Sequence, residues 1–196
     1  MNNSKVKINS IKNLANDHYK LDKVNFDYQT KDGTWQNQSR ESYDRGDGAC
    51  ILLYNSDKKT VILTKQFRMP SYLNENEDGM MIEVCAGLLD EDDPITCIKK
   101  EAEEETGYKI TEPKKVFELY STPGAVTEKI HYFIAEYSDS MKISDGGGIE
   151  DETEEIEVLE FSFKEAFNMI STGEICDAKT VILLQYAQIN NLIHSI

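Results

Sequence analysis

Two glutamates one helical turn apart are the first residues in this sequence that could do chemistry. Glu101 and Glu105 are four positions apart, so on a helix they share a face, with Glu104 further round. Like charges at this spacing repel each other, and a neighbouring apolar stripe, formed by Ile95, Ile98 and Ala102, would partly desolvate them. The arrangement is favourable if a divalent cation bridges both carboxylates, because hard ions such as Mg²⁺ prefer carboxylate oxygens.

The helix that would carry these acids has recognisable ends. Asp93 followed by Pro94 is typical of a helix start and Gly107 of a helix stop, so we expect a helix over residues 94–106. The alternative explanation is a solvated acidic face, which is the usual fate of a charge run. A predicted strand that ends at Ala86 and Gly87, just before this helix, favours the metal site.

The elements that must position this helix are mostly strands. Strands are expected over residues 51–54, 61–67, 80–85, 116–120, 130–137 and 156–161. Further helices are expected after Ser162, whose capping box includes Glu165, and after Asp177. Strands with interspersed helices indicate a mixed α/β sandwich. The first 45 residues are polar β-structure with a hairpin of residues 19–30 and 34–43, and we expect them to pair with another surface.

The composition excludes several classes of protein. The chain has 196 residues, 36 acidic against 21 basic, and a net charge of −15, so it is repelled by the phosphate backbone and we expect no nucleic-acid partner. No apolar run is long enough to span a membrane, and the N-terminus lacks the pattern of a secretory signal. Four scattered cysteines without a CxxC pair favour free thiols and a cytoplasmic location.

Residues 87–108 strongly resemble the Nudix box, the loop–helix–loop signature of hydrolases that act on nucleoside diphosphates linked to another group. Two positions depart from the usual box: Asp93 stands in place of glutamate and Lys100 in place of arginine. The box is also one residue shorter between its glycine and this basic position. The resemblance implies an α/β/α Nudix sandwich.

The shortened box and most of the chain are similar to the GDP-mannose pyrophosphatase branch of that superfamily. The segments that carry this similarity are residues 43–46, 65–68, 85–89, 123–128, 146–152, 172–174 and 177–179. The resemblance implies Mg²⁺-dependent hydrolysis of GDP-mannose to GMP and mannose 1-phosphate, with Mn²⁺ as an alternative cation. It also implies a homodimer in which an N-terminal extension, residues 1–45, is swapped across the interface, and a hydrolase domain over residues 46–196.

The same resemblance assigns roles to individual residues. Its metal ligands are the Ala86 carbonyl, Glu101, Glu105 and Glu152, and Glu104 would order a water. Either Glu128 or Glu152 would be the general base, and the resemblance slightly favours Glu128. The alternative for Glu128 is an exposed loop acid. The substrate-binding set is Arg40, Glu41, Arg68, Ala86, Gly87, Leu88, Glu105, Glu128, Asp151, Glu152 and Lys179.

Arginine is scarce in this chain, which narrows the candidates for diphosphate binding. There are three arginines against eighteen lysines, and guanidinium is the better bidentate partner for phosphate. Arg68, at the end of a predicted strand, and Arg40, in the N-terminal hairpin, are therefore the candidates. Lys179 could add a contact where the last helix starts. A surface position is the alternative for all three.

Two other functions stay open. ADP-ribose or another nucleotide sugar could be the substrate, because Pro123 lies where relatives that cleave ADP-ribose commonly have proline. A non-catalytic Nudix-fold nucleotide-binding module is a different class, but such modules typically lose a box glutamate. This chain keeps Glu101, Glu104 and Glu105.

Overall fold

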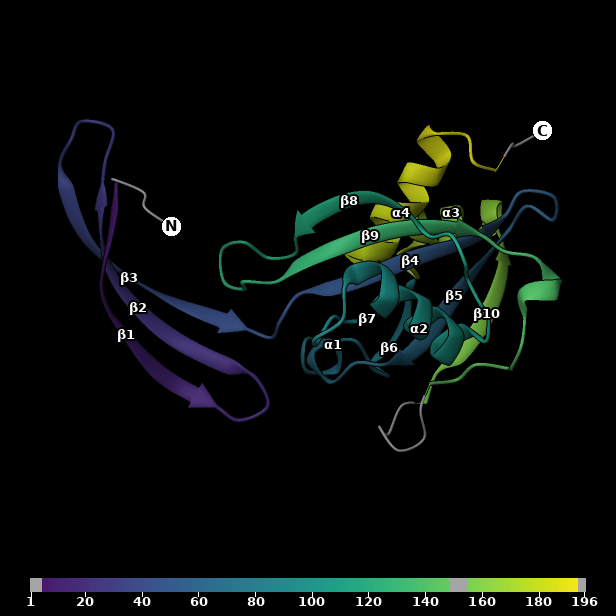
Figure 1. Ribbon diagram of the computed structural model, residues 1–196, viewed down its shortest axis with the longest axis horizontal. Helices are drawn as coiled ribbons and strands as arrows, with labels where there is room; N and C mark the ends of the chain where they lie inside the picture. Colours follow the sequence, from purple (N-terminus) through teal and green to yellow (C-terminus); the bar gives the residue numbers. More distant parts are fainter. Residues whose placement is uncertain (1–4, 149–154, 194–196) are drawn as a thin grey trace. The chain divides into compact units, whose positions relative to one another are not determined.

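The computed structural model describes residues 5–148 and 155–193. The chain divides into two compact units, one formed by residues 1–47 with 120–130 and the other by residues 48–119 with 131–196. Each unit has its own sheet, and the two are described separately below (Figure 1).

The N-terminal sheet is antiparallel, in the order β1 (Val6–Asn16), β2 (Lys20–Gln29) and β3 (Trp35–Asp44). The predicted hairpin is confirmed: β2 pairs with β3 from Lys20↔Asp44 to Gln29↔Trp35, and Gly33 takes φ +88° in the turn. The first strand, β1, was not predicted as a separate element. This sheet leaves large apolar side chains exposed, among them Ile8, Ile11, Leu14 and Trp35.

The larger sheet belongs to the second unit and has the strand order β10-β5-β4-β9-β8, with β6 beside β5 and β7 beside β4. Its strands are β4 (Gly48–Asn55), β5 (Thr60–Phe67), β6 (Met80–Glu83), β7 (Cys85–Leu88), β8 (Lys114–Tyr120), β9 (Lys129–Glu136) and β10 (Glu157–Ser162). Strands β4 and β5 are almost wholly buried, and they correspond to the most apolar runs of the sequence.

The segment from β6 to β7 inserts between β4 and β5. Those two strands pair with each other only from Leu53↔Ile62 to Asn55↔Thr60. Beyond that point β6 pairs with β5 and β7 pairs with β4, and the change of partner occurs at Val84. The predicted single strand over residues 80–85 is therefore two strands. The Val84 N–H, which lies between them, donates instead to Thr180 Oγ1 at 2.8 Å.

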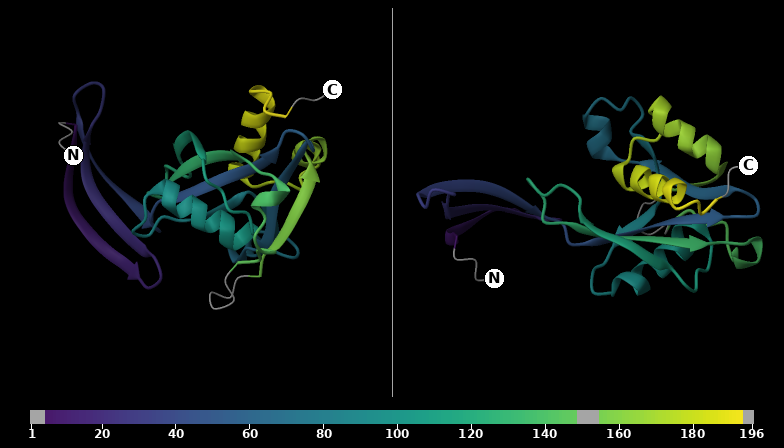
Figure 2. Two further views of the ribbon diagram at one scale, coloured as in Figure 1. Left: turned by 45° about the vertical axis from the view of Figure 1, so that its right-hand side comes forward. Right: turned by 90° about the horizontal axis from the view of Figure 1, so that it is seen from above.

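Helices cover both faces of this sheet, which confirms the predicted sandwich. Helix α2 (Pro94–Thr106) lies on one face, and α3 (Phe163–Thr172) and α4 (Ala178–Ile189) lie on the other (Figure 2). All three helices agree with their predicted caps. Two short elements, α1 (Met69–Leu73) and η1 (Asp139–Met141), complete the unit. None of the helices in the described ranges has the length and apolarity needed to span a bilayer.

The buried face of α2 differs in one position from the predicted stripe. Ile98 and Ala102 are fully buried in the core beneath β4, but Ile95 is 47% exposed. The buried face begins with Cys97 and Ile98 and continues through Ala102 to Glu105. The prediction that Ile95 faces the core was therefore wrong, because helix burial begins only after the first turn. An acid, Glu105, continues the buried face at the other end.

Candidate active site

Helix α2 is held at both ends by side-chain and backbone contacts. At its start, the Asp93 carboxylate accepts hydrogen bonds from the N–H groups of Ile95 and Thr96, at 3.0 and 3.2 Å. At its end, Gly107 takes φ +78° and donates its N–H to the Glu103 carbonyl. These contacts fix the position of the helix that carries the three glutamates.

A loop of three glycines covers the carboxyl end of α2. The N–H groups of Gly147 and Gly148 donate to the carbonyls of Glu105 and Glu104, at 2.9 and 3.2 Å. At Gly146, with φ +70°, an added Cβ would lie 2.5 Å from the Glu105 carbonyl oxygen, so this position excludes any side chain. The Ile156 N–H donates to the Gly147 carbonyl at 3.3 Å. The described residues on the two sides of the undescribed range 149–154 are therefore held together beside α2.

The carboxylates of α2 lie against β7. Glu105 is 2% exposed, and its Oε2 accepts a hydrogen bond from the Ala86 N–H at 3.2 Å. A Cβ added at Gly87 would overlap the Glu101 carboxyl, so glycine is required for this approach. The Leu88 carbonyl accepts a hydrogen bond from the Cys97 thiol at 3.2 Å and so links β7 to α2. The predicted set of Ala86, Gly87, Leu88, Glu101 and Glu105 is thus brought together.

The negative charge of this site affects the pKa of the Cys85 thiol. Burial raises its pKa well above the usual value, and the neighbouring carboxylates of Glu105 and Glu101 raise it further. Within the described residues, no group of three or more His, Cys, Asp or Glu side chains forms a ready metal cluster. Two carboxylates and a strand end are in place, and the other predicted ligand, Glu152, lies outside the described residues together with Asp151.

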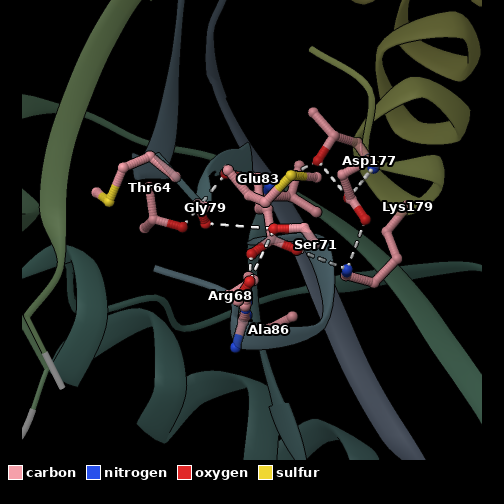
Figure 3. Close-up of polar contacts among 12 residues, drawn as sticks. Thr64, Arg68, Ser71, Gly79, Glu83, Ala86, Asp177 and Lys179 are labelled. Atoms are coloured by element: carbon pink, nitrogen blue, oxygen red, sulfur yellow. Dashed lines mark hydrogen bonds and ion pairs between the residues drawn. The ribbon is translucent and has the colours of Figure 1, made fainter. Parts of the chain in front are cut away.

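A second charged group surrounds Glu83, an acid that sequence reasoning missed. Glu83 is 4% exposed and forms ion pairs with Arg68 Nε at 2.7 Å and with Lys179 Nζ at 3.1 Å (Figure 3). Lys179 is also paired with Asp177, at 2.8 Å. Glu83 stands in the apolar run Met-Met-Ile-Glu-Val-Cys, and a carboxylate buried with such a strand needs a cationic partner. An acid inside an apolar strand is the sequence signal that could have identified Glu83.

The charges of this group shift one another's pKa values. Burial alone would lower the pKa of Lys179, but the negative charges of Glu83 and Asp177 outweigh burial and raise it to about 12. Burial would raise the pKa of Asp177, but the Lys179 charge and the hydrogen bonds from Lys179 and Thr180 lower it. Lys179 is therefore a partly buried cation, with its side chain 19% exposed, and not the surface residue of the alternative prediction.

Arg68 also lines an open cleft of about 990 Å³. Its side chain is 41% exposed, and the cleft is also lined by Glu155 and Ile156, which directly follow the undescribed range. Among the described residues, its lining is Lys65, Gln66, Phe67, Arg68, Met80, Glu155, Ile156 and Glu157. A cleft of this size can hold a nucleotide-sized ligand.

Of the other predicted residues, Glu128, Arg40 and Glu41 belong to the first unit and Glu104 to the second. Glu128 is 8% exposed, accepts a hydrogen bond from Ser121 Oγ at 2.7 Å and lies 3.4 Å from Arg45 Nε. The alternative of an exposed loop acid was therefore wrong, because Glu128 is buried between these two partners. Arg40 and Glu41 are exposed on β3, where the Arg40 guanidinium donates to the Ser39 carbonyl at 2.8 Å. Glu104 is exposed on α2.

Comparisons with known proteins agree with this architecture. The family described as the GDP-mannose pyrophosphatase NudK N-terminal domain matches residues 5–43, and the NUDIX domain matches residues 44–183. Relatives named GDP-mannose pyrophosphatase include those of Escherichia coli O1:K1 / APEC, 56% identical over 179 residues, and Shigella dysenteriae serotype 1, 56% identical over 180 residues. These alignments cover 91% and 92% of this chain and 93% of each relative. With its Nudix domain, its box helix and relatives along most of its length, the chain belongs to the Nudix hydrolase superfamily.

Proposed function

We propose that this chain is a divalent-metal-dependent pyrophosphatase that hydrolyses GDP-mannose to GMP and mannose 1-phosphate. The observation that carries the proposal is the approach of two α2 carboxylates, Glu101 and Glu105, to the strand end at Ala86 and Gly87. The substrate comes from the names of the relatives, which are 56% identical over about nine-tenths of the chain.

The residues of this site fit a hard divalent cation. The Glu101 and Glu105 carboxylates lie beside β7, and the Ala86 carbonyl and Glu152 would complete an all-oxygen ligand set suited to Mg²⁺, or to Mn²⁺ as an alternative. When bound, the cation would neutralise charge on the diphosphate oxygens and make a water more acidic. The glycine at position 87 supports this fit because it lets a carboxylate reach the backbone.

The remaining residues would bind the substrate and move protons. Glu104 would order the attacking water, and Glu128 or Glu152 would accept its proton. Arg68, whose guanidinium lines the cleft, would contact the diphosphate. The full proposed binding set is Arg40, Glu41, Arg68, Ala86, Gly87, Leu88, Glu105, Glu128, Asp151, Glu152 and Lys179.

The proposal is tested with a panel of substrates. GDP-mannose, ADP-ribose and UDP-glucose are incubated with the protein and Mg²⁺, and the products are separated by ion-exchange chromatography. The expected result is a kcat/KM for GDP-mannose at least tenfold above the others. Equal rates for all three would overturn the substrate assignment, and tight binding without turnover would indicate a nucleotide-binding module.

We also propose that the functional form is a homodimer in which residues 1–45 form an N-terminal extension swapped onto a second copy, with residues 46–196 as the hydrolase domain. The support is the apolar surface of the N-terminal sheet, where Ile8 and Ile11 are 63% and 58% exposed. Light scattering coupled to size-exclusion chromatography should give twice the mass of 22.4 kDa. The double variant Ile8→Asp/Ile11→Asp should give the single mass, and a monomeric wild type would contradict the proposal.

We propose a cytoplasmic location on the state of the cysteines. Cys50, Cys85 and Cys97 are buried free thiols and Cys176 is an exposed one. Free thiols are typical of a reducing compartment. Fractionation of the source cells with an antibody to this chain should recover it with the cytoplasmic fraction, and recovery from a secreted fraction would contradict the assignment.

A further inference from the structure

The two carboxylate oxygens of Glu83 accept hydrogen bonds from two different cations. Oε2 accepts from Arg68 Nε at 2.7 Å, and Oε1 accepts from Lys179 Nζ at 3.1 Å. The carboxylate is buried at the end of β6, where the chain leaves β5 and joins β4. Glu83 thus bridges Lys179, at the start of α4, and Arg68 (Figure 3). Arg68 in turn lines the cleft.

The contact with Glu83 occupies one edge of the Arg68 guanidinium. A guanidinium has five N–H donors, and its two terminal nitrogens form the fork that matches a phosphate. Glu83 accepts from the Nε–H, and within the described residues the terminal nitrogens make no hydrogen bond. The fork is therefore available to a ligand in the cleft that Arg68 lines, and the Nε contact restrains the side chain.

The other side of the bridge is anchored to a helix. The Asp177 carboxylate caps α4 by accepting from the Thr180 N–H at 2.9 Å, and it also accepts from Lys179 Nζ at 2.8 Å. Thr180 Oγ1 accepts in turn from the Val84 N–H, next to Glu83 in the chain. Lys179 and Glu83 are consequently fixed by α4 and by the β6–β7 junction together.

The formal charges of the cluster cancel. Arg68 and Lys179 contribute two positive charges, and Glu83 and Asp177 contribute two negative charges. Such a group adds little net attraction for an anionic substrate. Its contribution would therefore be to orient the Arg68 guanidinium and not to supply net positive charge. A purely structural ion network has no need of an arginine that lines a cleft and uses only its Nε–H in the network.

We propose that Glu83 is a positioning residue for hydrolysis, which acts through Arg68 by fixing the guanidinium fork toward the diphosphate in the cleft. This inference rests on the proposed function, because it takes the substrate to be a nucleoside diphosphate sugar. A misplaced donor costs little in binding but much in the rate of the chemical step. Loss of Glu83 is therefore expected to act mainly on kcat.

A double-mutant cycle of Glu83→Gln and Arg68→Ala tests this dependence. We expect Glu83→Gln to lower kcat for GDP-mannose at least tenfold with less than a threefold change in KM. In the Arg68→Ala background, the same substitution should change kcat/KM by less than twofold, because the residue through which it acts is gone. Effects that multiply in the double variant, or a Glu83→Gln variant within threefold of wild type, would overturn the inference.

Controls separate this inference from loss of fold and from failure of the proposed function. Glu160→Gln removes a carboxylate that accepts from Tyr137 Oη at 2.8 Å, in another network of the same unit, and should leave kcat within twofold. If Glu83→Gln does not fold, as judged by circular dichroism, Glu83→Asp enters the same cycle with the same expectations. A wild type that cleaves no nucleotide sugar defeats the proposed function, whereas an active wild type with a multiplicative cycle defeats only the role of Glu83.

Discussion

Two groups of acids flank the short strand β7, and they are built differently. Glu83 precedes β7 and has cationic partners, Arg68 and Lys179, at 2.7 and 3.1 Å. Glu105, from α2, accepts a hydrogen bond from the backbone N–H of Ala86, and its charge raises the pKa of the Cys85 thiol. The first group pairs two acids with two cations, whereas the second brings the carboxylates of Glu101 and Glu105 beside β7. In the proposals above, the first group directs a substrate-binding arginine and the second holds the cation.

The largest effect should follow from the second group. Glu105→Gln keeps the volume and an acceptor for the Ala86 N–H but removes a proposed metal ligand, so kcat should fall by about 10³-fold or more while the fold persists. Steady-state rates with saturating Mg²⁺, together with circular dichroism, measure both properties. Glu112→Gln, at an exposed position, is the matched control. A Glu105→Gln rate within threefold of wild type would show that this carboxylate holds no metal.

The next effect concerns the approach of Glu101 to the backbone. In Gly87→Ala the new Cβ would overlap the Glu101 carboxyl and displace it, so we expect about 100-fold lower kcat, since small misplacements are costly. The Mg²⁺ concentration for half-maximal rate should also rise. Gly124→Ala is the control, because a Cβ there meets open space. Equal rates for Gly87→Ala and wild type would argue against a role for this close contact.

Substitution in the first group, that of Glu83 and its cations, should affect activity less but lower stability measurably. Lys179→Met removes a partly buried cation that the buried Glu83 shares with Asp177, so the free energy of unfolding should fall by about 3 kcal/mol. Lys142→Met, which breaks an exposed pair with Asp145, should cost less than about 1 kcal/mol. Urea unfolding measures both values. Equal losses would contradict the distinction between a buried and a surface pair.

The smallest effect is the pH dependence of that stability. The pKa of Asp177 is lowered in the folded protein, so its contribution is present above the unfolded value of about 3.9 and is lost as the pH falls below it. Lys179 acts in the opposite direction: its pKa is raised to about 12, and its contribution is lost as the pH rises from about 10.4 through that value. In urea unfolding at acid pH, the free energy of unfolding of Asp177→Asn should fall less steeply with decreasing pH than that of wild type. An unchanged pH dependence would contradict this assignment.

The elements of the hydrolase unit were largely predictable because each follows from local rules. Caps at Asp93, Ser162 and Asp177 fix the helix starts, and apolar runs fix the buried strands. The break at Val84 could not be predicted, since it depends on which strand each half of residues 80–88 meets. The exposure of Ile95 likewise depends on how far α2 extends over the sheet.

The site was predicted in part, for a physical reason. Acids on one helix share a face whatever the fold, so Glu101 and Glu105 could be placed from spacing alone. The pairing of Glu83 with Lys179 joins residues 96 positions apart, and no local pattern encodes it. The burial of Glu128 depends on Arg45 and Ser121, which the fold brings beside it.

The central claim is hydrolysis of a diphosphate linkage by a cation-dependent site. The most direct measurement is mass spectrometry of the products after incubation of the protein with GDP-mannose in ¹⁸O-labelled water, with Mg²⁺ and with excess chelator. We predict GMP and mannose 1-phosphate, one of them carrying a single ¹⁸O, and no products with chelator. Formation of GDP and free mannose, or turnover that is unchanged by the chelator, would contradict the account.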